Sequence, residues 1–140
     1  EKYPDLYHAI IKAGHCVGNH SYSHKNGWLS CSKSYIKDVE KCQKLMPENK
    51  LFRPPYGKIS ALQIHKLKKK FTLIAWNVFS WDFLRNINPE KVKENVLKNI
   101  DHGSIVVFHN NQKSYTKLKP ILKETIQELK RKGFSFSFTW

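Results

Sequence analysis

The stretch FTLIAWNVF, residues 71–79, is a nearly continuous apolar run. It lacks the alternation of a half-exposed strand, so it predicts a strand that is buried on both faces. A helical pattern from Ser60 to Lys70 precedes it, and Asn88-Pro89 starts another helix after it. A buried strand between two helices is typical of the parallel sheets of α/β proteins.

The same alternation continues on both sides of this stretch. Helices are predicted over residues 4–13, 32–46, 60–70, 88–100 and 117–132, and strands over 15–19, 51–52, 71–79, 104–108 and 134–138. The pattern predicts an α/β fold with a parallel sheet, either an open doubly wound sheet or a barrel, although five strands do not close a barrel of about eight. We expect one domain over residues 1–140 that lacks its first strand, because the chain starts on a helix.

Composition narrows the class of protein further. The 140 residues are 40% hydrophobic, and no run of about 18 apolar residues could span a membrane. The net charge of +14 favours anionic partners, but the lysines follow several helices and no nucleic-acid motif is present, so we expect no nucleic acid. No signal-peptide pattern is visible. The three cysteines predict no disulfide framework, and Cys16 and Cys42 are expected at core or boundary positions.

His20 and His24 are the densest group of chemically capable side chains. If the segment formed a helical turn, both imidazoles would lie on one face and could reach one cation. Ser21 stands where a zincin helix carries its glutamate, so the pair is not a zincin motif. Two surface histidines in a polar turn are the alternative interpretation.

Polar groups also follow the other predicted strands. Arg53-Pro54-Pro55-Tyr56 follows the second strand, Asp82-Phe83 follows the third, and His109 follows the fourth. Carboxyl ends of parallel strands meet at one edge, so these groups are predicted to share one rim with the histidine pair. Each has a structural alternative, as a surface ion-pair residue, a turn residue or a buried core histidine.

These groups suit metal-assisted hydrolysis better than other chemistries. No Gly-x-Ser-x-Gly nucleophile motif or phosphate-binding glycine loop is present. Two histidines could hold a metal that activates water, with His109 as general acid and Asp82 fixing its tautomer. The backbone amide near Tyr56 could stabilise an oxyanion. No Asp or Glu is obviously placed as the general base.

The sequence resembles a known family at these same positions. His20-Ser21-Tyr22-Ser23-His24, Arg53-Pro54-Pro55-Tyr56-Gly57, Asp82-Phe83 and Val107-Phe108-His109 are similar, in order, to motifs two to five of the polysaccharide deacetylases. These are the NodB-homology domains of carbohydrate esterase family four. The resemblance implies a distorted (β/α) barrel of about seven strands. It also implies metal-dependent removal of N-acetyl, less often O-acetyl, groups from a glycan.

The resemblance implies roles for individual residues. His20 and His24 would bind a divalent metal, most often zinc, with cobalt or nickel as alternatives, and Ser21 would steady their loop. His109, Asp82 and Arg53 would be catalytic, with Arg53 paired to the base. Tyr56, Pro55, Phe83 and Val107 would contact the glycan substrate, with Val107 against the acetyl methyl group. The family implies a bacterial cell-envelope or secreted location.

Three departures from the family pattern change what we expect. The Asp-Asp motif that supplies the base and third metal ligand is absent, so we expect a truncated and inactive fragment of an active enzyme. Phe83 replaces a usual Trp and Val107 a usual Leu, which leaves the glycan preference open. The alternative is a catalytically inactive carbohydrate-binding relative of the same fold.

Overall fold

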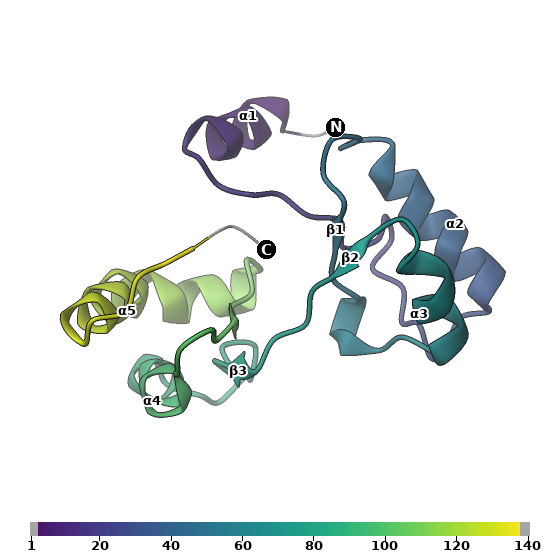
Figure 1. Cartoon of the computed structure of the whole chain (residues 1–140). Coiled ribbons are helices and arrows are strands. Elements are labelled where there is room, and N and C mark those ends of the chain that lie inside the picture. Colours follow the sequence, from purple (N-terminus) through teal and green to yellow (C-terminus); the bar gives the residue numbers. More distant parts are fainter. Residues whose placement is uncertain (1–2, 138–140) are drawn as a thin grey trace. The chain divides into compact units, whose positions relative to one another are not determined.

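The computed structural model describes residues 3–137 and divides the chain into two compact units, Glu1–Ala75 and Trp76–Trp140. Each unit contains one pair of parallel strands together with helices (Figure 1). All helix and strand bounds that follow refer to these described residues.

The first unit is built on the strands β1 and β2. They pair in parallel, with Leu51 opposite Thr72, and a single bridge joins Asn19 to Phe52. β1 therefore lies between β2 and the segment that leads to the histidine pair. In chain order the elements are α1 (Pro4–Lys12), α2 (Ser32–Gln43), β1 (Leu51–Phe52), the 3-10 turn η1 (Pro55–Gly57), α3 (Ala61–Leu67) and β2 (Thr72–Leu73).

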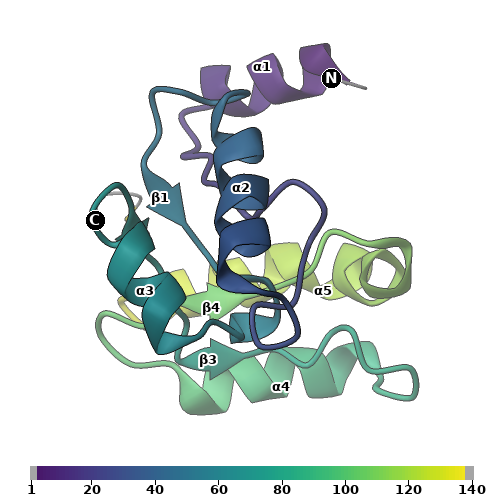
Figure 2. The ribbon, with the colours of Figure 1, turned by 90° about the vertical axis from the view of Figure 1, so that its right-hand side faces the viewer.

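Apolar side chains from α2, α3 and the strands form the core of the first unit. α2 and α3 lie side by side in both views (Figures 1 and 2). Phe52 is fully buried at the centre, with Tyr35 and Phe71 at ring-centroid distances of 6.4 and 5.9 Å. Val39 and Leu67 complete this buried cluster. By contrast, α1 contains no buried residue.

The second unit repeats the arrangement on a second two-stranded sheet. Its elements are β3 (Val78–Phe79), α4 (Pro89–Asn99), β4 (Val106–Val107) and α5 (Gln112–Arg131), and β3 pairs with β4 in parallel. α4 packs against both α5 and β3. Val92 of α4 contacts Leu118 and Ile121 of α5 in the core. This packing fixes the ends of β3 and β4, from which the second group of functional residues extends.

The predicted starts of α3 and α4 are confirmed by their caps. The Ser60 hydroxyl accepts a hydrogen bond from the Gln63 N–H, and the Gln63 side-chain oxygen accepts one from the Ser60 N–H, which makes a capping box. Asn88 caps α4, with Pro89 in its first turn. The prediction for α5 is wrong at its start, because the helix is capped by Asn111 and begins at Gln112, five residues before the predicted Lys117.

The single strand predicted over residues 71–79 is wrong. Thr72 and Leu73 pair with β1, whereas Val78 and Phe79 pair with β4 in a separate sheet. The Ile74 N–H donates to Phe52, and the Asn77 and Val78 N–H groups donate to Ile105. The beginning of the apolar run therefore pairs with β1 and its end pairs with β4. This change of partner interrupts the strand in the middle of the run.

Two further predicted strands are not found. In the segment 15–19 only Asn19 forms a bridge, and Cys16 is exposed, which contradicts its expected core or boundary position. Residues 134–137 are not in a strand, and Phe138 lies outside the described residues. Cys42 is buried, as predicted.

Parallel pairing, the basis of the predicted α/β class, is confirmed in both units. The described residues contain two separate two-stranded sheets, so the barrel of about seven strands stays a prediction. Within residues 3–137 no helix is both long and apolar enough to cross a membrane.

Replacing Ser60 by alanine is expected to lower the free energy of unfolding of the first unit by about 1 kcal/mol. The substitution leaves the first N–H groups of α3 without their capping oxygen. Urea unfolding, followed by NMR signals of residues 3–75, measures the change. Ser60→Asp keeps an accepting oxygen and serves as the matched control. An equal loss in both variants would contradict a capping role.

Candidate active site

A loop between Asn19 and Lys25 brings the two histidines together. Their ring centroids are 4.9 Å apart, with the planes at 72°. The segment is not helical, so the predicted helical turn is not the cause of this proximity. Instead, Ser21 and His24 both adopt left-handed backbone angles, with φ of 63° and 54°. The chain turns back on itself at these two residues, and both imidazoles lie at the exposed surface.

A hydrogen bond fixes the proton of His20. Its Nδ1 lies 2.6 Å from the carbonyl oxygen of Arg53, which can only accept. His20 Nδ1 therefore carries the proton, and Nε2 is the basic nitrogen. Metal-binding histidines in proteins are commonly oriented by a hydrogen bond of this kind to a carbonyl group. The arrangement suits His20 as an Nε2 metal ligand.

Asp38 of α2 holds the same loop. Its Oδ2 accepts hydrogen bonds from the N–H groups of Tyr22 and Ser23, both at 3.0 Å, and its Oδ1 accepts one from the Ser23 hydroxyl at 2.7 Å. Burial acts to raise the pKa of Asp38, but these hydrogen bonds and the charge of Lys25 together lower it. Burial, with the charge of Asp38, raises the pKa of the neighbouring Tyr35 to about 12.

Asn19 holds the start of the loop from the other side. Its side-chain amide donates to the Val39 carbonyl at 2.9 Å and to Gln43 Oε1 at 3.0 Å, and its Oδ1 accepts from the Ser21 N–H. The Ser21 hydroxyl, in contrast, is buried and has no hydrogen-bond partner. The side chains that steady the loop are therefore Asn19 and Asp38, whereas the resemblance had implied Ser21.

Arg53 and Tyr56 lie next to the histidines. Arg53 directs its guanidinium to the carbonyl oxygens of Ile74 and Ala75, both at 3.4 Å, and burial lowers its pKa. The Tyr56 ring packs edge-on against His24 with centroids 4.7 Å apart. Tyr56 has a left-handed φ of 58° directly after the buried Pro55. The predicted pairing of Arg53 with a catalytic base stays a prediction.

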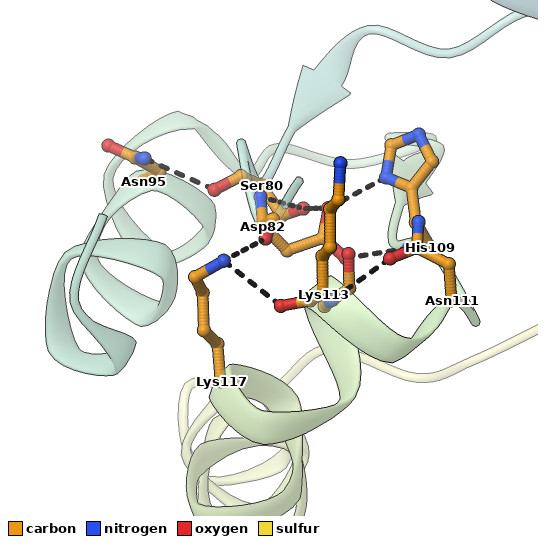
Figure 3. A network of polar contacts seen from close by, with 8 residues as sticks. Ser80, Asp82, Asn95, His109, Asn111, Lys113 and Lys117 are labelled. Atoms are coloured by element: carbon orange, nitrogen blue, oxygen red, sulfur yellow. Dashed lines mark hydrogen bonds and ion pairs between the residues drawn. The ribbon is translucent and has the colours of Figure 1, made fainter. Parts of the chain in front are cut away.

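In the second unit, Asp82 binds His109 through two contacts (Figure 3). One carboxylate oxygen lies 2.7 Å from His109 Nδ1, and the other accepts the His109 backbone N–H, also at 2.7 Å. An ionised carboxylate only accepts, so His109 Nδ1 carries a proton and Nε2 is the nitrogen that can exchange one. Asp82 is fully buried, while the His109 side chain is 36% exposed.

Three polar side chains surround Asp82 (Figure 3). The buried Ser80 hydroxyl donates to the Asp82 oxygen that contacts His109, at 3.0 Å. The Asn95 amide donates to the Ser80 carbonyl at 3.2 Å, and the Lys117 ammonium donates to the Asp82 carbonyl at 3.2 Å. α4 and α5 therefore both contribute to holding the aspartate in place. Sequence reasoning missed Ser80, Asn95 and Lys117.

Aromatic rings lie beside the same histidine. Phe83 packs edge-on against His109 with centroids 5.1 Å apart, and the Phe79 ring contacts both Phe83 and Trp81, at 5.5 and 4.8 Å. Trp81 is 44% exposed. Val107 is buried in β4, opposite Phe79 in the strand register. The substrate contacts predicted for Phe83 and Val107 stay predictions.

The predicted residues thus form two groups, each assembled within its own unit. The first group is His20, His24, Arg53, Pro55 and Tyr56, and the second is Asp82, Phe83, Val107 and His109. A rim shared by both groups stays a prediction. Within residues 3–137 no three His, Cys, Asp or Glu side chains are arranged to hold a metal ion, and the role of His20 and His24 as metal ligands stays a prediction.

Comparison with known proteins places the chain in a family. The family description "Polysaccharide deacetylase" matches residues 1–74, just over half of the chain. The chain therefore belongs to the polysaccharide deacetylase family. The family resemblance inferred from the sequence motifs is confirmed.

Individual relatives match over nearly the whole chain. A peptidoglycan-N-acetylglucosamine deacetylase of Bacillus cereus is 29% identical over 97% of this chain and 52% of its own length. The crystal structure of a peptidoglycan N-acetylglucosamine deacetylase superimposes with a TM-score of 0.84 at 29% identity, over 97% of this chain and 66% of that one. The chain thus spans about half the length of the first curated relative.

One solved relative derives from a pseudoenzyme. It is a mutant, with restored enzymatic activity, of a carbohydrate esterase family four pseudoenzyme. It matches with a TM-score of 0.74 at 25% identity, over 91% of this chain and 47% of that chain. The family therefore contains both enzymes and a naturally inactive member with a similar structure.

Proposed function

We propose that this chain is part of one metal-dependent deacetylase domain that removes acetyl groups from a glycan containing N-acetylglucosamine. The observation that carries the proposal is the contact between Asp82 and His109, because it gives a general acid with a defined tautomer. The domain assignment covers residues 1–140, and the distorted barrel of the family is its proposed fold. Glycan polymers such as peptidoglycan are the proposed substrates.

His20 and His24 would hold the metal, with zinc as the first candidate and cobalt or nickel as alternatives. The fit rests on two adjacent imidazoles and on the hydrogen bond that leaves His20 Nε2 basic. The chemistry that a bound divalent metal supplies is Lewis acidity, which polarises a carbonyl group and makes water a better nucleophile.

His109 would act when the carbon–nitrogen bond of the acetamide breaks. Its protonated imidazole donates the Nε2 proton to the departing nitrogen, which leaves as an amine. The Asp82 carboxylate keeps the Nδ1 proton in place and stabilises the positive charge of the imidazolium. Arg53 would pair with the base, and the Tyr56 amide would stabilise the oxyanion. Pro55, Phe83 and Val107 would shape the acetyl site.

The general base is the component that this sequence does not provide. No Asp-Asp pair occurs in the 140 residues, so we propose that the isolated chain is inactive. An inactive carbohydrate-binding relative is the second candidate, supported by the missing pair and by the pseudoenzyme relative. The two candidates differ in one respect, because only the enzyme releases acetate.

Acetate release from N-acetylglucosamine oligomers and from peptidoglycan, measured on the complete gene product, tests the proposal. We expect acetate release with added zinc, its loss when a chelator is added, and its recovery when zinc is restored. His20→Ala with His24→Ala is expected to remove it, whereas exposed His65 of α3, replaced by alanine, should have no effect. Glycan binding without acetate release under any metal would favour the inactive relative.

A further inference from the structure

We propose that Asp38 is a positioning residue for the histidine pair: from α2 it fixes the loop that presents His20 and His24 to the metal. The part of this inference that concerns metal affinity rests on the proposed function. The part that concerns the geometry of the loop stands on the contacts of Asp38 alone.

The histidine loop requires an external restraint. Ser21 and His24 have side chains and yet adopt φ values of 63° and 54°, in the left-handed region that such residues rarely occupy. Backbone conformations of this kind persist only where the surrounding structure holds them. The two residues between them, Tyr22 and Ser23, must therefore be tied to something rigid.

Asp38 provides that tie from the second turn of α2. Three donors converge on its carboxylate, the N–H groups of Tyr22 and Ser23 at 3.0 Å and the Ser23 hydroxyl at 2.7 Å. Hydrogen bonds to an ionised carboxylate are stronger than those between neutral groups. Asp38 is only 9% exposed, so water competes little for these donors.

The charges around Asp38 favour its ionised form. Lys25 faces it from the end of the loop, and the lowered pKa of Asp38 agrees with a carboxylate that is charged at neutral pH. Tyr35, one turn earlier on α2, keeps its hydroxyl buried, and that hydroxyl has no hydrogen-bond partner. The Asp38 carboxylate accepts from both the Tyr22 and the Ser23 N–H groups, so replacing it by a methyl group removes the acceptor of these two bonds.

The test uses the 140-residue chain, zinc alone as the probe, and four proteins. Asp38→Ala removes the acceptor, and Asp38→Asn keeps one oxygen for the two N–H groups but loses the charge. Glu40→Gln is the matched control, since it removes one negative charge from the same helix, where Glu40 pairs with Lys70 at the surface. NMR follows the imidazole signals of His20 and His24 during zinc titration, and amide hydrogen exchange of Tyr22 and Ser23.

Asp38→Ala is expected to weaken zinc binding at the pair about 10- to 100-fold, the usual effect of removing a group that orients metal ligands. Exchange of the Tyr22 and Ser23 amides should become at least about tenfold faster, because an exposed amide exchanges through local opening. Asp38→Asn should lie between Asp38→Ala and the native chain. Glu40→Gln should match the native chain in both measurements.

Native zinc affinity and native amide protection in Asp38→Ala would overturn the inference. If Asp38→Ala does not fold, the same result in Asp38→Asn would overturn it. A different outcome separates the two proposals: if zinc does not shift His20 and His24 in the native chain, the proposed metal ligands are wrong. In that case loss of amide protection and of the His20–His24 ring contact in Asp38→Ala would still support the positioning role.

Discussion

Replacing His109 by alanine is expected to lower kcat for acetate release by about 10²- to 10⁴-fold in the complete gene product. The departing nitrogen would lose its proton donor, while the groups that bind the glycan would be unchanged. KM should therefore change much less than kcat. Steady-state kinetics on an N-acetylglucosamine oligomer separate the two constants.

Two further variants define the role of His109. Asp82→Asn should also lower kcat, because an amide at this position can donate to Nδ1 and so favour the wrong tautomer. His102→Ala is the matched control, since His102 is an exposed histidine of the same unit on the turn before β4. A His109→Ala protein with nearly native kcat would exclude His109 as the general acid.

Replacing Phe52 by alanine is expected to lower the free energy of unfolding of the first unit by about 3–5 kcal/mol. Phe52 is fully buried between Tyr35 and Phe71, and the cavity left by its ring cannot be filled without moving β1. Urea unfolding followed by NMR signals of residues 3–75 measures the change.

The same substitution should disturb the histidine loop. The Arg53 carbonyl, which accepts the His20 Nδ1 proton, directly follows Phe52 in the chain. Leu62→Ala is the matched control, because Leu62 is 53% exposed on α3 and its loss should cost less than about 0.5 kcal/mol. A loss below about 1 kcal/mol for Phe52→Ala would show that the core cluster closes around the gap.

The predictions made from the sequence are most accurate where a local interaction determines the structure. Ser60 and Asn88 mark helix starts because their side chains accept hydrogen bonds from N–H groups three residues later, which is a purely local interaction. The predicted carboxyl end of β1 is correct and that of β4 is one residue too late, and Arg53 and His109 both follow strands as predicted. The parallel pairing followed from the alternation of helices and strands.

Prediction failed where a distant partner decides the structure. Residues 71–79 are apolar throughout, and no local signal says that Leu73 and Val78 pair with different strands. From the sequence alone, Asp38 cannot be told from a solvent-facing residue of a helix. The residues that it binds lie fifteen and sixteen positions earlier, so no local pattern indicates the contact. The contact between Asp82 and His109 spans 27 positions and was suggested only by their places at strand ends and by the family motifs.

The way in which Asp38 holds the loop has a consequence for sequence variation. At position 22 the aspartate binds only the backbone N–H, which every residue except proline provides. The Tyr22 side chain is 40% exposed, and its ring contacts the Lys41 ammonium instead of the aspartate, so replacing it should leave the backbone hydrogen bond in place. At position 38 the side chain itself accepts the hydrogen bonds. We therefore expect substitutions among related sequences to be more frequent at position 22 than at position 38.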